Sequence, residues 1–168
     1  MKNEKPSFEI RLCRGDAERR ACAEIMATTD PWLTLGRDLA FCYAALEGSG
    51  KELYVAVDDG KVLGLIALNM KGSLVGYIQS VAVRADARGR GVGRALVAYA
   101  EERVFSEVPN VFLLVSSFNA GARKLYEELG YSFVGELKDF VVAGHSENLM
   151  RKTLGPLRGY KPSPRPPS

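Results

Sequence analysis

The chain has 168 residues, of which 46% are hydrophobic and 26% are charged, and this composition suits one globular domain with a single core. Its formal net charge of +3 is small and its basic residues are scattered, which argues against a nucleic-acid-binding protein. No apolar run approaches the roughly 20 residues that a membrane span requires, and the polar N-terminus has no apolar secretion signal, so a cytoplasmic protein is expected.

The N-terminal part predicts a strand and two helices. Alternating apolar residues over positions 8–12 predict the strand. Asp16 is then expected to cap a helix that runs to about Thr28, where Asp30-Pro31 ends it. A second helix is predicted over residues 37–46.

An antiparallel meander of three strands comes next. Asp59-Gly60 is a strong signal for a two-residue hairpin, and it joins an alternating segment at residues 53–57 to a strand over residues 61–69. A turn at Lys71-Gly72 then leads into a strand over residues 76–83.

The C-terminal part begins with a strand-helix-strand unit. A helix over residues 92–104 carries apolar residues at four-residue steps, which is typical of a face turned toward a core. The continuous apolar strand at residues 111–115 is predicted to lie parallel to the preceding strand, through a right-handed crossover. The remaining elements are a helix and two strands: residues 119–129, about 131–142 and 147–154. Together these elements predict a mixed α/β sheet flanked by helices.

The segment Arg88-Gly89-Arg90-Gly91-Val92-Gly93 lies where a strand gives way to a helix. Glycines let the chain turn tightly and expose backbone amides, and the helix adds its own unpaired amides and the positive end of its dipole. This arrangement predicts a phosphate site. The chain has no Gly-Lys-Ser/Thr, which excludes a mononucleotide P-loop, and no register of the glycines fits G-x-G-x-x-G/A, which argues against NAD and FAD.

The spacing that does fit is R/Q-x-x-G-x-G/A, filled by Arg88, Gly91 and Gly93. A second segment, residues 119–131, matches N-x-x-A-x-x-L-Y-x-x-x-G-F/Y. In both segments the chain resembles the GCN5-related N-acetyltransferase (GNAT) superfamily, and the resemblance covers roughly residues 8–154. It implies an N-acetyltransferase that moves the acetyl group of acetyl-CoA to a primary amine. It also implies a mostly antiparallel sheet whose central parallel strands splay apart.

The resemblance further implies which residues hold acetyl-CoA. Backbone groups around two strand residues would hold the pantetheine arm, and the glycine loop with its arginines would hold the pyrophosphate. The helix that begins near Asn119 would contribute one face to the cleft. The predicted acetyl-CoA-binding residues are Val81, Val83, Arg88, Gly89, Arg90, Gly91, Gly93, Arg94, Asn119 and Arg123.

Tyr126 is the candidate general acid, which would hydrogen-bond or protonate the CoA sulfur. Glu147 and His145 are candidate bases, and a base acting through ordered water and backbone carbonyls is an equal alternative. Ribosomal-protein N-terminal acetyltransferases resemble the chain in this segment, but they carry a glutamate where this sequence has Leu114. Assignment to that subfamily is therefore not favoured.

Acceptor specificity is expected in loops outside the CoA motifs, with Trp32 and Asp139 as candidate substrate-binding residues. The acceptor stays open between a small-molecule amine and a protein N-terminus or lysine. No metal is expected, because the three cysteines and His145 share no metal-ligand spacing.

One acetyltransferase domain is predicted over residues 1–154, followed by a flexible, proline-rich basic tail over residues 155–168 that cannot add to the core. Two alternatives to an enzyme are kept. One is a non-catalytic acyl-CoA-binding sensor on the same fold, and the other is a nucleic-acid-associated protein that uses this tail. Assembly into a homodimer is also expected as one state of the protein.

Overall fold

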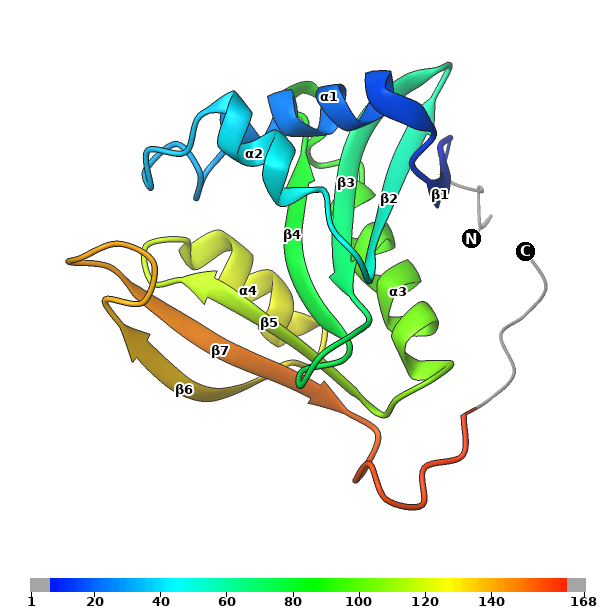
Figure 1. Cartoon of the computed structure of the whole chain (residues 1–168), viewed down its shortest axis with the longest axis vertical. Helices are drawn as coiled ribbons and strands as arrows, with labels where there is room; N and C mark the ends of the chain where they lie inside the picture. Colours follow the sequence, from blue (N-terminus) through cyan, green and yellow to red (C-terminus); the bar gives the residue numbers. More distant parts are fainter. Residues whose placement is uncertain (1–6, 163–168) are drawn as a thin grey trace.

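The elements follow one another in a computed structural model that describes residues 7–162 (Figure 1). In chain order they are β1 (Glu9–Leu12), α1 (Gly15–Ala27), α2 (Leu39–Ala45), β2 (Lys51–Asp58), β3 (Lys61–Asn69), β4 (Tyr77–Val83), the 3₁₀ helix η1 (Ala85–Ala87), α3 (Val92–Phe105), β5 (Asn110–Ser116), α4 (Ala120–Glu128), β6 (Ser132–Lys138) and β7 (Ser146–Thr153). The strands form one sheet in the order β1-β2-β3-β4-β5-β7-β6.

Only one neighbouring strand pair of this sheet is parallel, and it separates along its length. In β4 and β5, Tyr77 pairs with Phe112 and Ile78 pairs with Leu113. Beyond these pairs β4 continues to Val83 and β5 to Ser116 without pairing with each other, so their carboxyl ends diverge (Figure 1). This confirms the mixed, mostly antiparallel sheet with a central splayed parallel pair.

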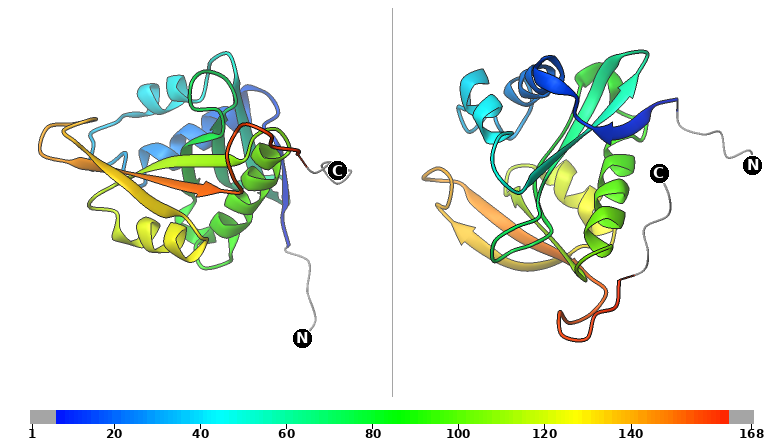
Figure 2. Two further views of the ribbon diagram at one scale, coloured as in Figure 1. Left: turned by 90° about the horizontal axis from the view of Figure 1, so that it is seen from below. Right: turned by 45° about the vertical axis from the view of Figure 1, so that its right-hand side comes forward.

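Helices cover the two faces of the sheet unequally (Figure 2). On one face, α1 and α2 bury Cys22, Met26 and Cys42 against β2, β3 and β4. On the other face, the buried stripe of α3, which includes Leu96 and Val97, packs against β2 to β5. In Figure 1, α1 and α2 lie over β2, β3 and β4, whereas β5, β7 and β6 extend to the other side of the divergence.

Local sequence signals account for most element boundaries. The hairpin between β2 and β3 turns through Asp59 and Gly60, with φ angles of 47° and 71°, as an Asp-Gly hairpin requires. The predicted cap of α1 is wrong: the helix begins at Gly15 after Arg14, whose N–H donates to Glu18 Oε2 at 2.6 Å. At the N-terminus of α1, the hydrogen bond to a backbone N–H is therefore accepted by the carboxylate of Glu18 and not by that of Asp16.

The last hairpin is shorter than predicted. β6 ends at Lys138, which pairs with Ser146, so residues 139–145 form a loop instead of strand. Residues 155–162 of the predicted tail turn back toward α3, where the Tyr160 hydroxyl donates to the Phe105 carbonyl at 2.6 Å. The rest of the tail and the first six residues lie outside the described residues. No helix between residues 7 and 162 is long and apolar enough to cross a membrane.

Candidate functional site

The glycine loop joins η1 to α3 at one end of the opening between β4 and β5. Gly89 and Gly91 have φ angles of 74° and 78°, a region that glycine enters without strain. Gly91 is the N-cap of α3, and no side chain caps the helix, so its first amides stay available to an anion. A hollow of about 370 Å³ lies here, lined by Val83, Ala87, Arg88, Gly89, Gly91, Val92, Gly93, Arg94 and Leu125.

The three predicted loop arginines have different surroundings. Arg90 donates to Asp58 Oδ2 and to Ser7 Oγ, each at 2.9 Å, and Arg94 is paired with Glu128 of α4. Arg88 has no such ion pair between residues 7 and 162. Because exposed ion pairs contribute little stability, Arg90 and Arg94 can exchange their carboxylates for a phosphate at small cost.

A second hollow continues from the loop along β4. Its volume is about 360 Å³, and it shares Val83 and Arg88 with the first. Its lining comes from the end of α1, from β4 and from the start of α4: Thr28, Thr29, Asp30, Leu33, Val81, Ala82, Val83, Arg88 and Asn119. Val81, Val83 and Asn119 thus lie along one path that leads away from the glycine loop.

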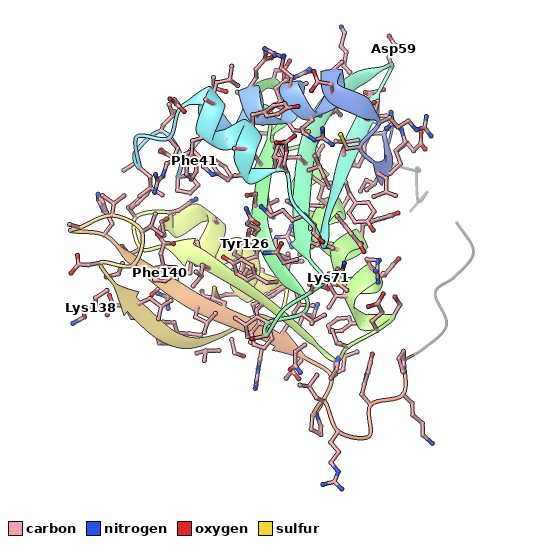
Figure 3. All side chains as sticks on the ribbon, in the orientation of Figure 1. Phe41, Asp59, Lys71, Tyr126, Lys138 and Phe140 are labelled. Carbon is pink, nitrogen blue, oxygen red and sulfur yellow. The ribbon has the colours of Figure 1, made fainter. Side chains whose placement is uncertain are left out.

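An inner cavity of about 270 Å³ lies at the end of this path. Its lining includes Phe41 of α2, Phe140 of the loop after β6 and Tyr126 of α4, which are labelled in Figure 3. The lining residues are Asp30, Pro31, Trp32, Leu35, Arg37, Phe41, Ala45, Tyr77, Gln79, Ser80, Val81, Leu114, Val115, Ser116, Asn119, Ala122, Tyr126, Phe140, Val141 and Glu147.

Tyr126 is positioned by α4. The helix begins after Asn119, whose Oδ1 accepts the Ala122 N–H at 3.2 Å, and this cap sets which residues face the cavity. The Tyr126 ring packs edge-on against Tyr131, with 5.7 Å between ring centroids. Burial raises the pKa of Tyr126 to about 12, so the hydroxyl keeps its proton at neutral pH. Tyr126 therefore contributes a protonated hydroxyl to the lining residues of the cavity.

Glu147 supplies a buried carboxylate to the same cavity. It lies near the start of β7 opposite Ser116 of β5, whose hydroxyl donates to Glu147 Oε1 at 2.8 Å. Only 5% of Glu147 is exposed. Burial raises the pKa of this carboxyl, against smaller opposing effects of the Ser116 hydrogen bond and of His145. A carboxylate of raised pKa is a better proton acceptor than an ordinary surface glutamate.

Three other predicted residues lie apart from the inner cavity. His145 packs edge-on against Phe118, with 5.0 Å between ring centroids, and does not line the cavity. Asp139 has a φ of 51°, and its Oδ1 accepts the Gly144 N–H at 2.7 Å, so its side chain holds its own loop together. Arg123 donates to Glu127 at 2.9 Å and lies over Phe133, away from all three hollows.

Trp32 lines the inner cavity and also packs against the core beneath α1. Several other lining residues were not expected from the sequence. Phe140, which is 60% exposed, had a signal, because it is a large apolar residue beside a loop. Arg37 and Ser116 had none, because only the fold brings them to the cavity. Between residues 7 and 162, no group of three His, Cys, Asp or Glu side chains is placed to hold a metal ion.

The glycine loop lies at a helix N-terminus and leads into a cleft between splayed strands. This combination is typical of α/β proteins that bind acyl-CoA. Residues 18–131 match the sequence profile of the acetyltransferase (GNAT) family. The chain belongs to this family.

Known proteins give further similarities. The N-acetylaspartate synthetase of Xenopus tropicalis is 29% identical over 115 residues, which are 67% of this chain and 42% of that protein. The chain thus spans less than half the length of this curated relative. The structure of a ribosomal-protein-alanine N-acetyltransferase from Brucella melitensis is 26% identical, with a TM-score of 0.66 over 87% of this chain and 99% of that chain. An aminoglycoside 6′-N-acetyltransferase complexed with coenzyme A shares the fold, with 18% identity and a TM-score of 0.70 over 88% of this chain and 98% of that chain.

Proposed function

We propose that this protein transfers the acetyl group of acetyl-CoA to a primary amine by direct attack in a ternary complex. One observation carries the proposal. The hollow at the N-terminus of α3 shares residues with the hollow along β4, and that hollow shares Asp30, Val81 and Asn119 with the cavity of Tyr126 and Glu147. The path joins an anion site to a proton donor and a proton acceptor.

The residues along this path fit acetyl-CoA. The uncapped amides of α3 and the unpaired Arg88 would bind the pyrophosphate. Backbone groups of Val81 and Val83 would hold the pantetheine arm, because β4 leaves them unpaired on the side facing β5. Asn119 would contact the same arm, since its side-chain amide nitrogen makes no hydrogen bond between residues 7 and 162.

Bound acetyl-CoA supplies the activated thioester, and two side chains of this chain move the protons. Glu147 accepts a proton from the acceptor amine, directly or through water, and the amine nitrogen then forms a bond to the thioester carbonyl carbon. As the carbon–sulfur bond breaks, Tyr126 gives its proton to the departing thiolate. The products are the acetylated amine and CoA.

A covalent acyl-enzyme is not needed, and the cysteines do not favour one. Cys22 is fully buried, and burial raises its pKa to about 12, so its thiol stays protonated and unreactive. Neither Cys13 nor Cys42 lines the inner cavity. These observations support direct transfer.

Replacement of the proton donor tests this function. We expect Tyr126→Phe to lower kcat by about 10²–10⁴-fold, the usual contribution of a positioned acid, with little change in acetyl-CoA affinity. CoA release is measured with a thiol reagent over a panel of amines, and binding is measured by calorimetry. Phe keeps the edge-on packing against Tyr131, so folding is preserved.

The same assay separates an enzyme from a sensor. Unchanged turnover in Tyr126→Phe would remove the proposed acid. Tight CoA binding by the parent protein with no turnover on any amine would instead support a non-catalytic acyl-CoA-binding domain.

The relatives supply two ideas about the acceptor. The name N-acetylaspartate synthetase indicates an amino-acid amine, and the name ribosomal-protein-alanine N-acetyltransferase indicates a protein substrate. The sequence has Leu114 where the latter subfamily carries a glutamate. Here the carboxylate of the cavity comes instead from Glu147 on the adjacent strand β7. We therefore favour a small-molecule amine. The homodimer and the cytoplasmic location stay predictions.

A further inference from the structure

The inner cavity has a single cationic side chain among its described lining residues, that of Arg37. Arg37 lies in the loop before α2, where its N–H donates to the Trp32 carbonyl at 2.9 Å. Its guanidinium lies over the Phe41 ring, 4.2 Å from the ring centroid. It forms no ion pair with any carboxylate of residues 7–162. A cation held against an aromatic ring and left without a carboxylate is ready to bind an anion.

Carboxylates of the cavity lie elsewhere. Glu147 is buried against Ser116. Asp30 also lines the hollow along β4, which places it toward the acetyl-CoA side, and its Oδ1 accepts the amide and the hydroxyl of Thr34 at 3.1 and 2.7 Å. Asp38 caps α2 and does not line the cavity. The cavity is therefore negative at its buried end and positive beside Phe41.

Apolar side chains form much of the remaining lining of the cavity. Trp32, Leu35, Phe41 and Phe140 line the cavity, and its volume of about 270 Å³ suits a single small molecule better than a polypeptide. A further hollow of about 440 Å³ shares Tyr77, Leu114 and Phe140 with it. The other residues of this hollow are Asn69, Lys71, Leu74, Leu137 and Leu149, so its lining is mostly apolar with one lysine. An apolar group that enters past Phe140 would thus find a mostly apolar surface.

We infer that the acceptor is a free amino acid with an apolar side chain, whose amine faces Glu147 and whose carboxylate binds Arg37. The planar guanidinium can give a carboxylate two parallel hydrogen bonds, which a neutral acceptor cannot accept in the same way. The apolar side chain occupies the hollow beside Phe140. This inference rests on the proposed acetyl transfer and names its substrate class and a specificity-determining residue.

Matched acceptors test the inference. L-Phenylalanine and L-leucine are compared with L-phenylalaninamide and phenethylamine, which keep the amine and the apolar body but lose the carboxylate. L-Aspartate and the dipeptide Phe-Gly distinguish an acidic amino acid and a peptide N-terminus from the proposed acceptor. We expect kcat/KM to be highest for the two free apolar amino acids, by about 10-fold or more over the uncharged analogues.

Variants of Arg37 then assign the effect. We expect Arg37→Gln to raise KM for L-phenylalanine about 10–100-fold, with kcat nearly unchanged and with no rise in KM for phenethylamine. Arg37→Lys should restore part of the affinity, because lysine keeps the charge but not the paired hydrogen bonds. Arg20→Gln, an exposed arginine of α1 that lines none of these hollows, is the matched control and should behave like the parent.

The outcomes separate this inference from the proposed function. The inference would be overturned if the analogues without a carboxylate were acetylated as fast as the free amino acids, or faster. It would also be overturned if Arg37→Gln raised KM equally for L-phenylalanine and phenethylamine. Either result would leave acetyl transfer intact. A preference for L-aspartate or Phe-Gly would also overturn it. Acetyl-CoA binding without turnover of any acceptor would overturn both.

Discussion

Glu147 shows how its surroundings change what one residue can do. The side chain is almost fully buried, and its carboxylate has the Ser116 hydroxyl as its hydrogen-bond donor among the described residues. Burial disfavours the charged form, so the pKa of Glu147 rises above that of a glutamate in water. The neighbouring hydroxyl of Tyr77 also has a raised pKa, through burial and the Glu147 charge. Glu147 and Tyr77 therefore both bind their protons more tightly in the protein than they would in water.

The activity of Glu147 is testable through its pH dependence. A base must be deprotonated, so kcat/KM of the parent should rise as pH increases through the raised pKa of Glu147. Glu147→Gln keeps the hydrogen bond from Ser116 but accepts no proton. We expect it to lower kcat about 10²–10⁴-fold and to abolish this acidic limb in the pH profile of steady-state rates. Glu136→Gln on the exposed surface of β6 is the control, and an unchanged limb in Glu147→Gln would assign the base elsewhere.

The same substitution makes a prediction about stability. Because the folded-state pKa of Glu147 lies above the unfolded value, the folded protein binds the proton more tightly. The free energy of unfolding therefore falls as pH rises from the unfolded pKa through the folded one. Glu147→Gln removes this titration, so at pH 7 it should be at least as stable as the parent in thermal unfolding. A clear loss of stability of Glu147→Gln at pH 7 would contradict the view that the charged Glu147 carboxylate lowers the free energy of unfolding.

At the scale of elements, the N-terminus of α3 combines a helix end with two left-handed glycines. Gly91 has a φ of 78° and no atom within 4 Å of an added Cβ, so its requirement is conformational and not steric. Gly93 lies within the first turn of α3, and its added Cβ would meet Val83 at 3.6 Å, an ordinary contact. Substitution of Gly91 therefore tests the cost of its left-handed backbone conformation, whereas substitution of Gly93 tests helix propensity.

Alanine substitutions at these positions should have opposite effects on stability. Gly91→Ala must place a Cβ in the left-handed region, which costs about 1–2 kcal/mol of unfolding free energy. Gly93→Ala replaces glycine inside a helix and should gain up to about 1 kcal/mol. Urea unfolding followed by circular dichroism measures both. Equal losses would show that the loop, and not the φ of Gly91, limits stability.

At the scale of the whole molecule, the sheet consists of two halves that are joined along a short segment. β4 and β5 pair over two residues, next to the hydrogen bond from the Phe112 N–H to the Gly76 carbonyl at 3.0 Å. A Cβ on Gly76 would lie 2.5 Å from the Asn110 carbonyl oxygen and 2.6 Å from Val104 Cγ1. The close approach of the halves at Gly76 thus precedes the divergence that opens the cleft.

Gly76 and Gly72 provide a matched test of this joint. Both have a positive φ, but nothing lies within 4 Å of an added Cβ at Gly72. We expect Gly72→Ala to cost only the conformational 1–2 kcal/mol, and Gly76→Ala to cost about 2–5 kcal/mol because overpacking adds to it. Chemical denaturation measures the difference. Similar losses at the two positions would mean that the halves adjust freely around Gly76.

The glycine loop, the order of elements and the motif that begins at Asn119 could all be predicted from the amino-acid sequence. These features depend on local rules: positive φ at glycine, strand and helix periodicity, and a cap three residues from its partner amide. The sequence did not determine the burial of Glu147, whose partner Ser116 is 31 residues away. It also did not show that Arg37 and Phe140 line one cavity, or that the Asp139 carboxylate accepts a hydrogen bond from Gly144 of its own loop. Burial and long-range contacts depend on which distant segments the fold packs together, so only the tertiary structure decided where the acceptor-side charges lie.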